Sequence, residues 1–205
     1  MAVVTTTETV RTSRGGRPRD PSRDGVIREA ILRLLGDVGY GALTMDAVAA
    51  EAGVGKATIY RRWRTKQDLV VDTISVMNQS LATPVDTGSL DGDVRAIVHR
   101  LVDVINGPVG TAIRSLLPSM QHQPELTEAF RTGPLQAWRD SYDRMWAQAE
   151  ERGDLTSGVS RSVLAETTTA LLVQRWLLTG EPVTHEYADE TLESVVLPLL
   201  HTRRP

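Results

Sequence analysis

Apolar residues recur at three- and four-residue intervals along most of the 205-residue chain, and this spacing constrains the fold more than any other feature. It places apolar side chains on one face of an α-helix, whereas a half-buried strand needs alternation of apolar and polar residues. No alternating stretch between turn residues is long enough to predict a strand. The predicted helices span residues 22–39, 44–52, 55–62, 65–81, 90–106, 109–121, 124–132, 134–152, 159–179 and 187–201. The predicted fold class is all-α, with about nine to ten helices.

Two short helices separated by a tight turn stand in the first third of the chain. Thr44 is a typical N-cap residue, and Gly53 ends the helix after barely two turns. A second short helix follows at once, and Thr65 caps the next one. Two short helices around a glycine-containing turn are the geometry of a helix-turn-helix. The chain is expected to divide into a flexible basic arm (1–21), a helix-turn-helix domain (22–68) and a helical body (69–205).

Positive and negative residues are distributed unevenly, although the net charge is only -3. Residues 11–66 carry a balance of +6, and the rest of the chain carries -9. Such asymmetry suggests a module that binds a polyanion, attached to an acidic body. Ordinary drift of surface charge along a sequence is the alternative.

The sequence has no cysteine, which excludes disulfides, thiolate zinc sites and cysteine nucleophiles. No apolar run approaches the ~18–20 residues that a membrane span needs, and the first 20 residues lack the apolar core of a secretory signal. We therefore expect a cytoplasmic protein without a membrane partner.

The most specific stretch of the chain covers residues 43–69 and reads LTMDAVAAEAGVGKATIYRRWRTKQDL. With its flanks, roughly residues 23–75, it resembles the DNA-binding domain of TetR-family transcriptional repressors in the Ala-Gly-Val turn, the Ile-Tyr pair and the spacing of Trp63, Lys66 and Leu69. The resemblance implies a homodimeric repressor that binds a palindromic operator on double-stranded DNA. It also implies that a small-molecule effector releases the repressor, and that residues 69–205 form the effector-binding and dimerisation domain.

The third helix is expected to lie in the major groove, because Ile59 and Trp63 are four residues apart and can anchor one face on the other helices. The residues expected to contact bases are Lys56, Ala57, Thr58 and Arg61. Those expected to contact phosphates are Thr44, Gly55, Tyr60, Arg62 and Lys66. Two alternatives stay open: Thr44 can be a plain N-cap, and Tyr60 can be a packing residue. Gly55 stands where the family often has a capping side chain, so one cap or phosphate contact is expected to be missing.

Arginines alternate with Gly and Pro in the N-terminal arm. The segment resembles the Gly-Arg-Pro core of hooks that enter the minor groove of A·T-rich DNA. The expected minor-groove contacts are Arg14, Arg17 and Arg19. A solvated arm that contacts nothing is the alternative.

The helical body resembles a C-terminal subtype common among actinobacterial members of the family, and it concentrates aromatic and methionine residues. Such residues suit a cavity for a largely apolar ligand, and they equally suit a filled core. The candidate pocket residues are Leu117, Met120, Phe130, Trp138, Tyr142, Trp146, Gln174 and Trp176.

The last two predicted helices carry more apolar surface than one side of a monomer needs to cover. We expect them to form a dimer interface, with packing inside the subunit as the alternative. The candidate interface residues are Val163, Leu164, Leu171, Leu172, Leu178, Leu192, Val195, Val196 and Leu199.

Enzyme motifs are missing from the sequence. The four histidines form no His-x-x-x-His or Glu-x-x-His pair, and no Gly-x-Ser-x-Gly elbow occurs. We therefore expect no catalytic residues, no metal and no cofactor. The alternative to a regulator is a helical small-molecule carrier or an enzyme whose basic segment is incidental.

Overall fold

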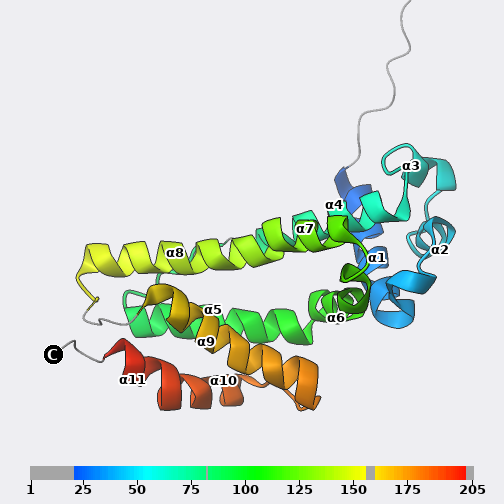
Figure 1. The fold of residues 1–205 in the computed structure, drawn as a ribbon. Coiled ribbons are helices and arrows are strands. Elements are labelled where there is room, and N and C mark those ends of the chain that lie inside the picture. Colours follow the sequence, from blue (N-terminus) through cyan, green and yellow to red (C-terminus); the bar gives the residue numbers. More distant parts are fainter. Residues whose placement is uncertain (1–20, 82, 156–159, 202–205) are drawn as a thin grey trace, which may run out of the picture.

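The computed structural model describes residues 21–81, 83–155 and 160–201, and every regular element in them is a helix (Figure 1). The prediction of an all-α fold is confirmed. None of the described helices is both long enough and apolar enough to cross a membrane. The helices are α1 (Pro21–Ala42), α2 (Met45–Glu51), α3 (Lys56–Tyr60), α4 (Lys66–Leu81), α5 (Leu90–Asn106), α6 (Pro108–Met120), α7 (Pro124–Thr132), α8 (Pro134–Arg152), α9 (Arg161–Gln174), α10 (His185–Thr191) and α11 (Leu197–Leu200), with π-helical turns η1 (Arg175–Thr179) and η2 (Leu192–Val196).

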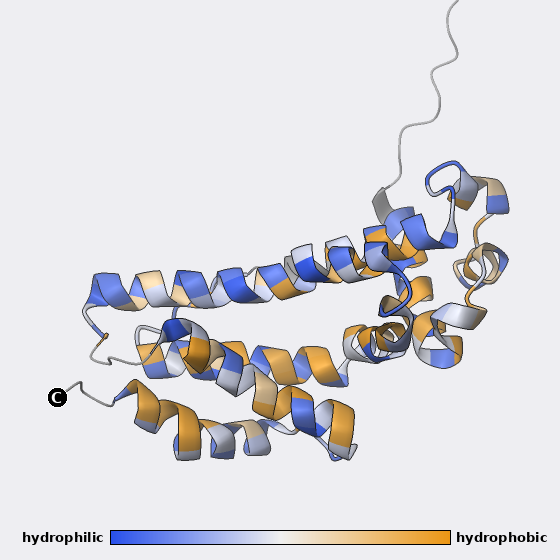
Figure 2. Cartoon of the chain, viewed as in Figure 1, coloured by the Kyte–Doolittle hydropathy of each residue, from blue (hydrophilic) through white to orange (hydrophobic). Residues whose placement is uncertain are grey.

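The molecule is elongated, with α2 and α3 at one end and α8 to α11 forming the other end (Figure 1). Its buried apolar residues form two clusters. One joins α1 to α4 and includes Ala112 and Leu116 of α6 and Leu126 and Ala129 of α7. The other joins α5 with α8 to α11. Figure 2 shows hydrophobic residues gathered on the α9 and α11 side, whereas the visible face of α8 is mostly hydrophilic.

The domain boundary predicted at residues 68 and 69 stays a prediction, but the packing crosses it. Leu69, Val70 and Ile74 of α4 are buried with the helix-turn-helix residues. We call the first cluster, with the helices α1 to α4, the head.

Capping side chains begin the short helices as the sequence predicts. The Thr44 hydroxyl accepts a hydrogen bond from the Ala47 amide at 3.1 Å. Thr65 and Asp68 form a reciprocal pair, in which each backbone amide donates to the other side chain at 3.0 Å. This is a capping box at the start of α4. Each cap satisfies amides that the first helical turn leaves without a partner.

The helix boundaries lie close to the prediction. Helix α1 is assigned as far as Ala42, but its backbone leaves the helical region at Gly39 (φ 72°, ψ 169°), where the first predicted helix ends. The final helix begins at His185, because the Thr184 hydroxyl caps it by accepting from the Tyr187 amide at 3.1 Å. Just before Pro198 the helix widens into the turn η2, where the Leu197 amide donates to the carbonyl of Leu192.

A buried ion pair holds the start of α5 against the end of α8. Asp93 is 0% exposed and accepts hydrogen bonds from the amide and the hydroxyl of Thr87, each at 2.7 Å. Arg152 donates to its other oxygen at 2.7 Å and also pairs with Asp154 at 2.8 Å. Burial acts to raise the pKa of Asp93, but the bonds from Thr87 and Arg152 outweigh it, so the pKa lies below that of an ordinary aspartate.

Asp93→Asn keeps the side-chain shape but removes the charge that Arg152 pairs with. We expect the free energy of unfolding at pH 7 to fall by about 1–3 kcal/mol, because the charged hydrogen bonds of Asp93 are lost while Arg152 keeps Asp86 and Asp154 as partners. Because folding lowers the pKa of Asp93, the stabilisation is complete above about pH 5 and is lost as the pH falls through the folded-state value. Urea unfolding measures it, with Asp154→Asn as the control that removes a more exposed partner of the same arginine. Equal midpoints for Asp93→Asn and the wild type would contradict this.

Candidate nucleic-acid interface and ligand cavity

Helix α3 stands at the tip of the head and is anchored as the sequence predicts (Figure 1). Ile59 is 0% and Trp63 is 7% exposed, and both belong to the head cluster. Lys56, Ala57 and Tyr60 of α3 are exposed, as is Arg61, the C-cap of the helix, and Thr58 is half-buried. Three of the four candidate base contacts are therefore exposed, and Thr58 is partly accessible.

Lys56 forms an ion pair with the preceding helix, α2. Its ammonium lies 2.5 Å from a carboxylate oxygen of Asp46, in the first turn of α2. The hydrogen bond to Asp46 and the charge of Asp46 raise the pKa of Lys56, so the side chain stays positively charged. A base that Lys56 contacts has to replace Asp46 as its acceptor.

Three of the candidate phosphate contacts are exposed, and the other two, Arg62 and Lys66, form polar contacts within the head. Thr44, Gly55 and Tyr60 are exposed, and Tyr60 is 50% exposed. The expected plain N-cap role of Thr44 is confirmed, and its exposure leaves the phosphate role open. Gly55 is the N-cap of α3 and makes no side-chain cap bond, as its sequence predicts.

Arg62 and Lys66 are engaged inside the head. Arg62 pairs with Asp24 of α1 and its side chain is 18% exposed, so the structure places it in the packing between α1 and α3 rather than on the free surface. The Lys66 ammonium donates to the carbonyls of Tyr40 at 2.9 Å and Gly41 at 3.3 Å. It thereby satisfies carbonyls at the end of α1, and it lies 4.5 Å from the centre of the Tyr40 ring.

Tyr40 also connects the head to the helical body. It is 5% exposed, and its hydroxyl donates to the side-chain oxygen of Gln123 at 2.9 Å. Gln123 is the N-cap of α7. Lys66 is thus linked through Tyr40 to the segment between α6 and α7.

Arg64 and the arm arginines are further basic residues of the candidate DNA-binding region. Arg64 was not singled out by the sequence, yet it is exposed and no ion pair of it is found among the described residues. The basic run at 61–66 was the available signal. The candidate arm residues Arg14, Arg17 and Arg19 lie outside the described residues.

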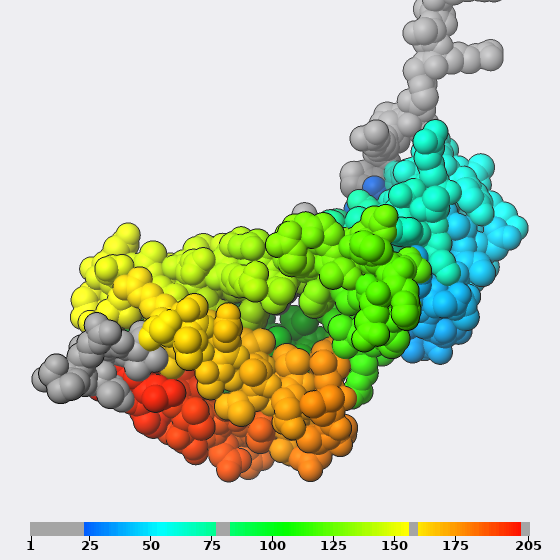
Figure 3. Space-filling model, in the orientation of Figure 1, coloured from blue at the N-terminus to red at the C-terminus, as the bar shows by residue number. Residues whose placement is uncertain are grey.

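The helical body contains a cavity of about 1010 Å³ between α5, α6, α8 and α9. Figure 3 shows the surface hollowed between the yellow-green residues of α8 and the orange residues of α9. Six of the eight candidate pocket residues line it: Leu117, Phe130, Trp138, Tyr142, Trp146 and Trp176.

The other two candidate pocket residues were wrongly placed. Met120 packs against the head cluster, and Gln174 is exposed and not part of the cavity wall. Both lie on the expected helices but on another face. The small residues Gly110, Ala165 and Ala170 also line the cavity and leave the space that the aromatic side chains surround, and no sequence pattern pointed to them.

Helix α6 forms a wall shared by the cavity and the head. Gly110, Ile113 and Leu117 line the cavity, whereas Ala112 and Leu116 on its other face are 0% exposed within the head cluster. The helix also lies very close to α1: a Cβ added to Gly36 would lie 2.9 Å from the methyl of Thr111. A shift of α6 would therefore displace side chains both in the cavity wall and in the head core.

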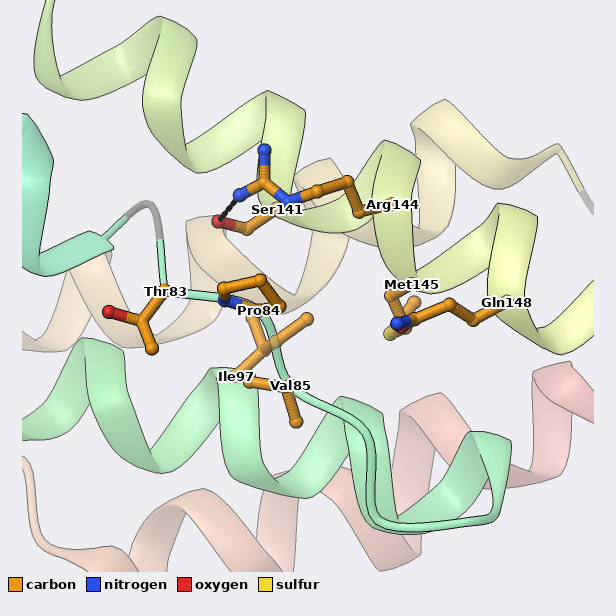
Figure 4. Close-up of a pocket in the computed structure, with 8 residues that line it drawn as sticks. All are labelled: Thr83, Pro84, Val85, Ile97, Ser141, Arg144, Met145 and Gln148. Carbon is orange, nitrogen blue, oxygen red and sulfur yellow. Dashed lines mark hydrogen bonds between the residues drawn. The ribbon is translucent and has the colours of Figure 1, made fainter.

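A second hollow lies between the segment 83–85, α5 and α8 (Figure 4). It includes Ile97, Met145 and a hydrogen bond of 3.2 Å from Arg144 to Ser141. Its interior volume is about 0 Å³, so it holds no ligand.

The candidate interface residues divide by exposure. Leu164, Leu172, Leu192 and Val196 are at most 3% exposed and pack within one subunit, so these four are corrected to core residues. Helical spacing alone did not separate them from their neighbours, because core and outer positions of α9 and the last helix are both apolar. Three candidates are exposed, Val163 at 55%, Leu178 at 78% and Leu199 at 38%, and Leu171 and Val195 are half-buried.

Comparison with known proteins agrees with this geometry. The model of "Bacterial regulatory proteins, tetR family" matches residues 27–73, and that of "Tetracyclin repressor-like, C-terminal domain" matches residues 84–195. An uncharacterized HTH-type transcriptional regulator of Mycobacterium tuberculosis is 31% identical over 191 residues, which cover 90% of this chain and 93% of that protein.

Two further relatives agree. The DNA-binding transcriptional repressor TetR of Mycobacteroides abscessus is 28% identical over 183 residues, covering 89% of this chain and 96% of that protein. A crystal structure of a TetR family transcription regulator superimposes with a TM-score of 0.65 at 25% identity, covering 90% of this chain and all of that one. The exposed helix α3, its buried anchors and these matches lead to one conclusion: the chain belongs to the TetR family of bacterial DNA-binding transcriptional regulators.

Proposed function

We propose that this regulator is a homodimeric repressor that leaves a palindromic operator when a small, largely apolar molecule occupies its cavity. The observation that carries the proposal is the shared helix α6, whose two faces line the cavity and the head core. Membership of a family of DNA-binding regulators favours this function over a helical carrier or an enzyme.

The coupling follows from packing. A ligand that fills the cavity contacts Ile113 and Leu117 on α6, and the opposite face of α6 holds Leu116 in the head. Closely packed interiors pass on displacements instead of absorbing them. Occupation of the cavity would therefore favour one orientation of the head over another, and a ligand that prefers the orientation unsuited to DNA lowers operator affinity.

A dimer is needed because one recognition helix reads too few base pairs, and a two-fold axis sets half-sites about one helical turn apart or a multiple of it. The exposed apolar residues Val163 and Leu178 on α9 and η1, with Leu199 on α11, support an interface on this side of the body. The half-buried Leu171 and Val195 extend it.

On the DNA side, we assign base contacts to Lys56, Ala57, Thr58 and Arg61 because they occupy the open side of α3. We assign phosphate contacts to Thr44, Gly55 and Tyr60, with Arg64 added for its exposed charge. The arm arginines keep their proposed minor-groove role on sequence grounds.

Operator binding is tested with DNA that flanks the gene of this protein and contains an inverted repeat. We expect affinity for the repeat to exceed that for a scrambled duplex by at least about 10³-fold and to fall linearly on a log scale with salt. Fluorescence anisotropy of labelled duplexes measures both. Equal affinity for the two duplexes would overturn the assignment of that repeat as the operator, and equal affinity for every flanking segment would overturn sequence-specific repression.

Lys56→Ala should cost about 1–3 kcal/mol on the operator and much less on scrambled DNA, because a base contact distinguishes sequences. Arg131→Ala is the control, since Arg131 is an exposed basic residue of the body that pairs with Glu128 at 2.8 Å. Equal losses on both duplexes for Lys56→Ala would remove Lys56 from base recognition.

Leu178→Asp should yield a monomer with weakened operator affinity, because the charge would be buried between two subunits. The side chain is 78% exposed in the single chain, so the substitution leaves the fold intact. Sedimentation velocity measures the mass, and Val38→Asp on α1, at an apolar position that is 49% exposed, is the control. A stable Leu178→Asp dimer would place the interface elsewhere.

A further inference from the structure

A carboxylate lies on the basic end of the head that is proposed to face DNA. Residues 44–65 include four basic residues and two acidic ones, Asp46 and Glu51. Glu51 pairs with Arg33 of α1 at 2.9 Å, so its charge is used within the head. Asp46 is exposed and lies beside the start of α3 instead. Because DNA is a polyanion, a carboxylate at this place lowers the affinity for DNA unless a group on the DNA compensates for it.

Asp46 is in contact with the first residue of α3. It stands in the first turn of α2, the helix next to α3 at this end of the molecule (Figure 1), and its carboxylate accepts a hydrogen bond from the Lys56 ammonium at 2.5 Å. The two side chains are 56% and 63% exposed, and ion pairs as exposed as this one contribute little to stability. The fold therefore does not depend on the pair, and both groups are accessible to partners on DNA.

The major-groove edge of a G·C base pair offers the partners that these two side chains need. Guanine presents the acceptors O6 and N7, and cytosine presents its N4 amino group as a donor. A lysine donates to the two guanine atoms, and an aspartate accepts from the cytosine amino group. O6 and N4 are neighbours, because they are hydrogen-bonded to each other within the base pair. One G·C pair can therefore bind both side chains, whose charged groups already lie 2.5 Å apart.

An exchange of partners makes this recognition selective. When Lys56 leaves Asp46 for a base, the carboxylate loses the ammonium and comes to lie against DNA, where water is partly excluded. Without a cytosine amino group in place it has no donor, and an unpaired charged group costs more than an ordinary hydrogen bond gains. An A·T pair presents its amino group between two acceptors, so a lysine cannot take two adjacent acceptors beside an aspartate on the donor. Only one orientation of one base pair satisfies both side chains.

We propose that Asp46 is a specificity-determining residue, and that Lys56 and Asp46 together read one G·C base pair in each half-site of the operator. Lys56 contacts the guanine and Asp46 contacts the cytosine of the same pair. This inference rests on the proposed base contact of Lys56. It adds a second reading residue, from the helix before α3, and the identity of the base pair.

Selection from a library of randomised DNA duplexes tests the proposal on the full chain. The wild type, Lys56→Ala, Asp46→Ala and the double variant each select duplexes, and sequencing gives the base preference at every position. We expect the wild type to prefer G·C at one position of each half-site by about 5- to 150-fold, which corresponds to about 1–3 kcal/mol. Each single variant should weaken the preference at that same position. The two effects should not add in the double variant, because the residues act as a unit.

Two further variants separate base reading from simple repulsion. Asp46→Asn removes the negative charge but keeps an oxygen that accepts from cytosine, so it should raise the affinity for every duplex and retain most of the G·C preference. Glu51→Ala is the matched control, because it removes the other carboxylate of this end, the one that pairs with Arg33. It should leave the G·C preference unchanged. Circular dichroism checks that each variant is folded.

The outcomes distinguish this inference from the proposed function. If Asp46→Ala raises the affinity for all duplexes by one factor and keeps every base preference, Asp46 only repels DNA and the inference is wrong. It is also wrong if Lys56→Ala and Asp46→Ala change different positions, or if the shared position is not G·C. In each of these cases, selective binding by the wild type still supports the proposed function. A wild type that selects no sequence at all overturns sequence-specific repression, and this inference with it.

Discussion

The contact between α1 and α6 is the interaction on which the rest of the structure depends. At Gly36 the two helices lie so close that a side chain there would meet Thr111. This closeness lets Ala112 and Leu116 enter the head core, although they belong to a helix of the body. Without it the head would lose Ala112 and Leu116 from its core, and a domain as small as this depends on each buried residue.

The contact between α1 and α6 is one of several that join the head and the body. Helix α4 starts in the helix-turn-helix and is buried with it through Leu69, Val70 and Ile74, and α7 adds Leu126 to the same core. Tyr40 adds a polar link through Gln123. The head and the body thus share α4, α6 and α7 as packing elements, and α6 also lines the cavity.

Local sequence signals predicted most of the fold and part of the site. The threonine caps, the short helices and the anchors Ile59 and Trp63 follow from the sequence because each depends on neighbours within a turn or two. The engagement of Arg62 with Asp24 and of Lys66 with Tyr40 could not be predicted, since both contacts join distant helices. Likewise, Leu164 and Val163 are adjacent apolar residues of which one is core and one is exposed, and only the fold decides between them.

The distribution of tryptophan gives this chain a built-in optical reporter. Of its four tryptophans, Trp138, Trp146 and Trp176 line the cavity and Trp63 is buried in the head. Indole emission depends on the polarity and the quenching groups around the ring. A molecule bound in the cavity would therefore change the emission of three tryptophans at once. The fourth, Trp63, reports on packing in the head beside α3. One fluorescence spectrum therefore contains emission from both the cavity and the head.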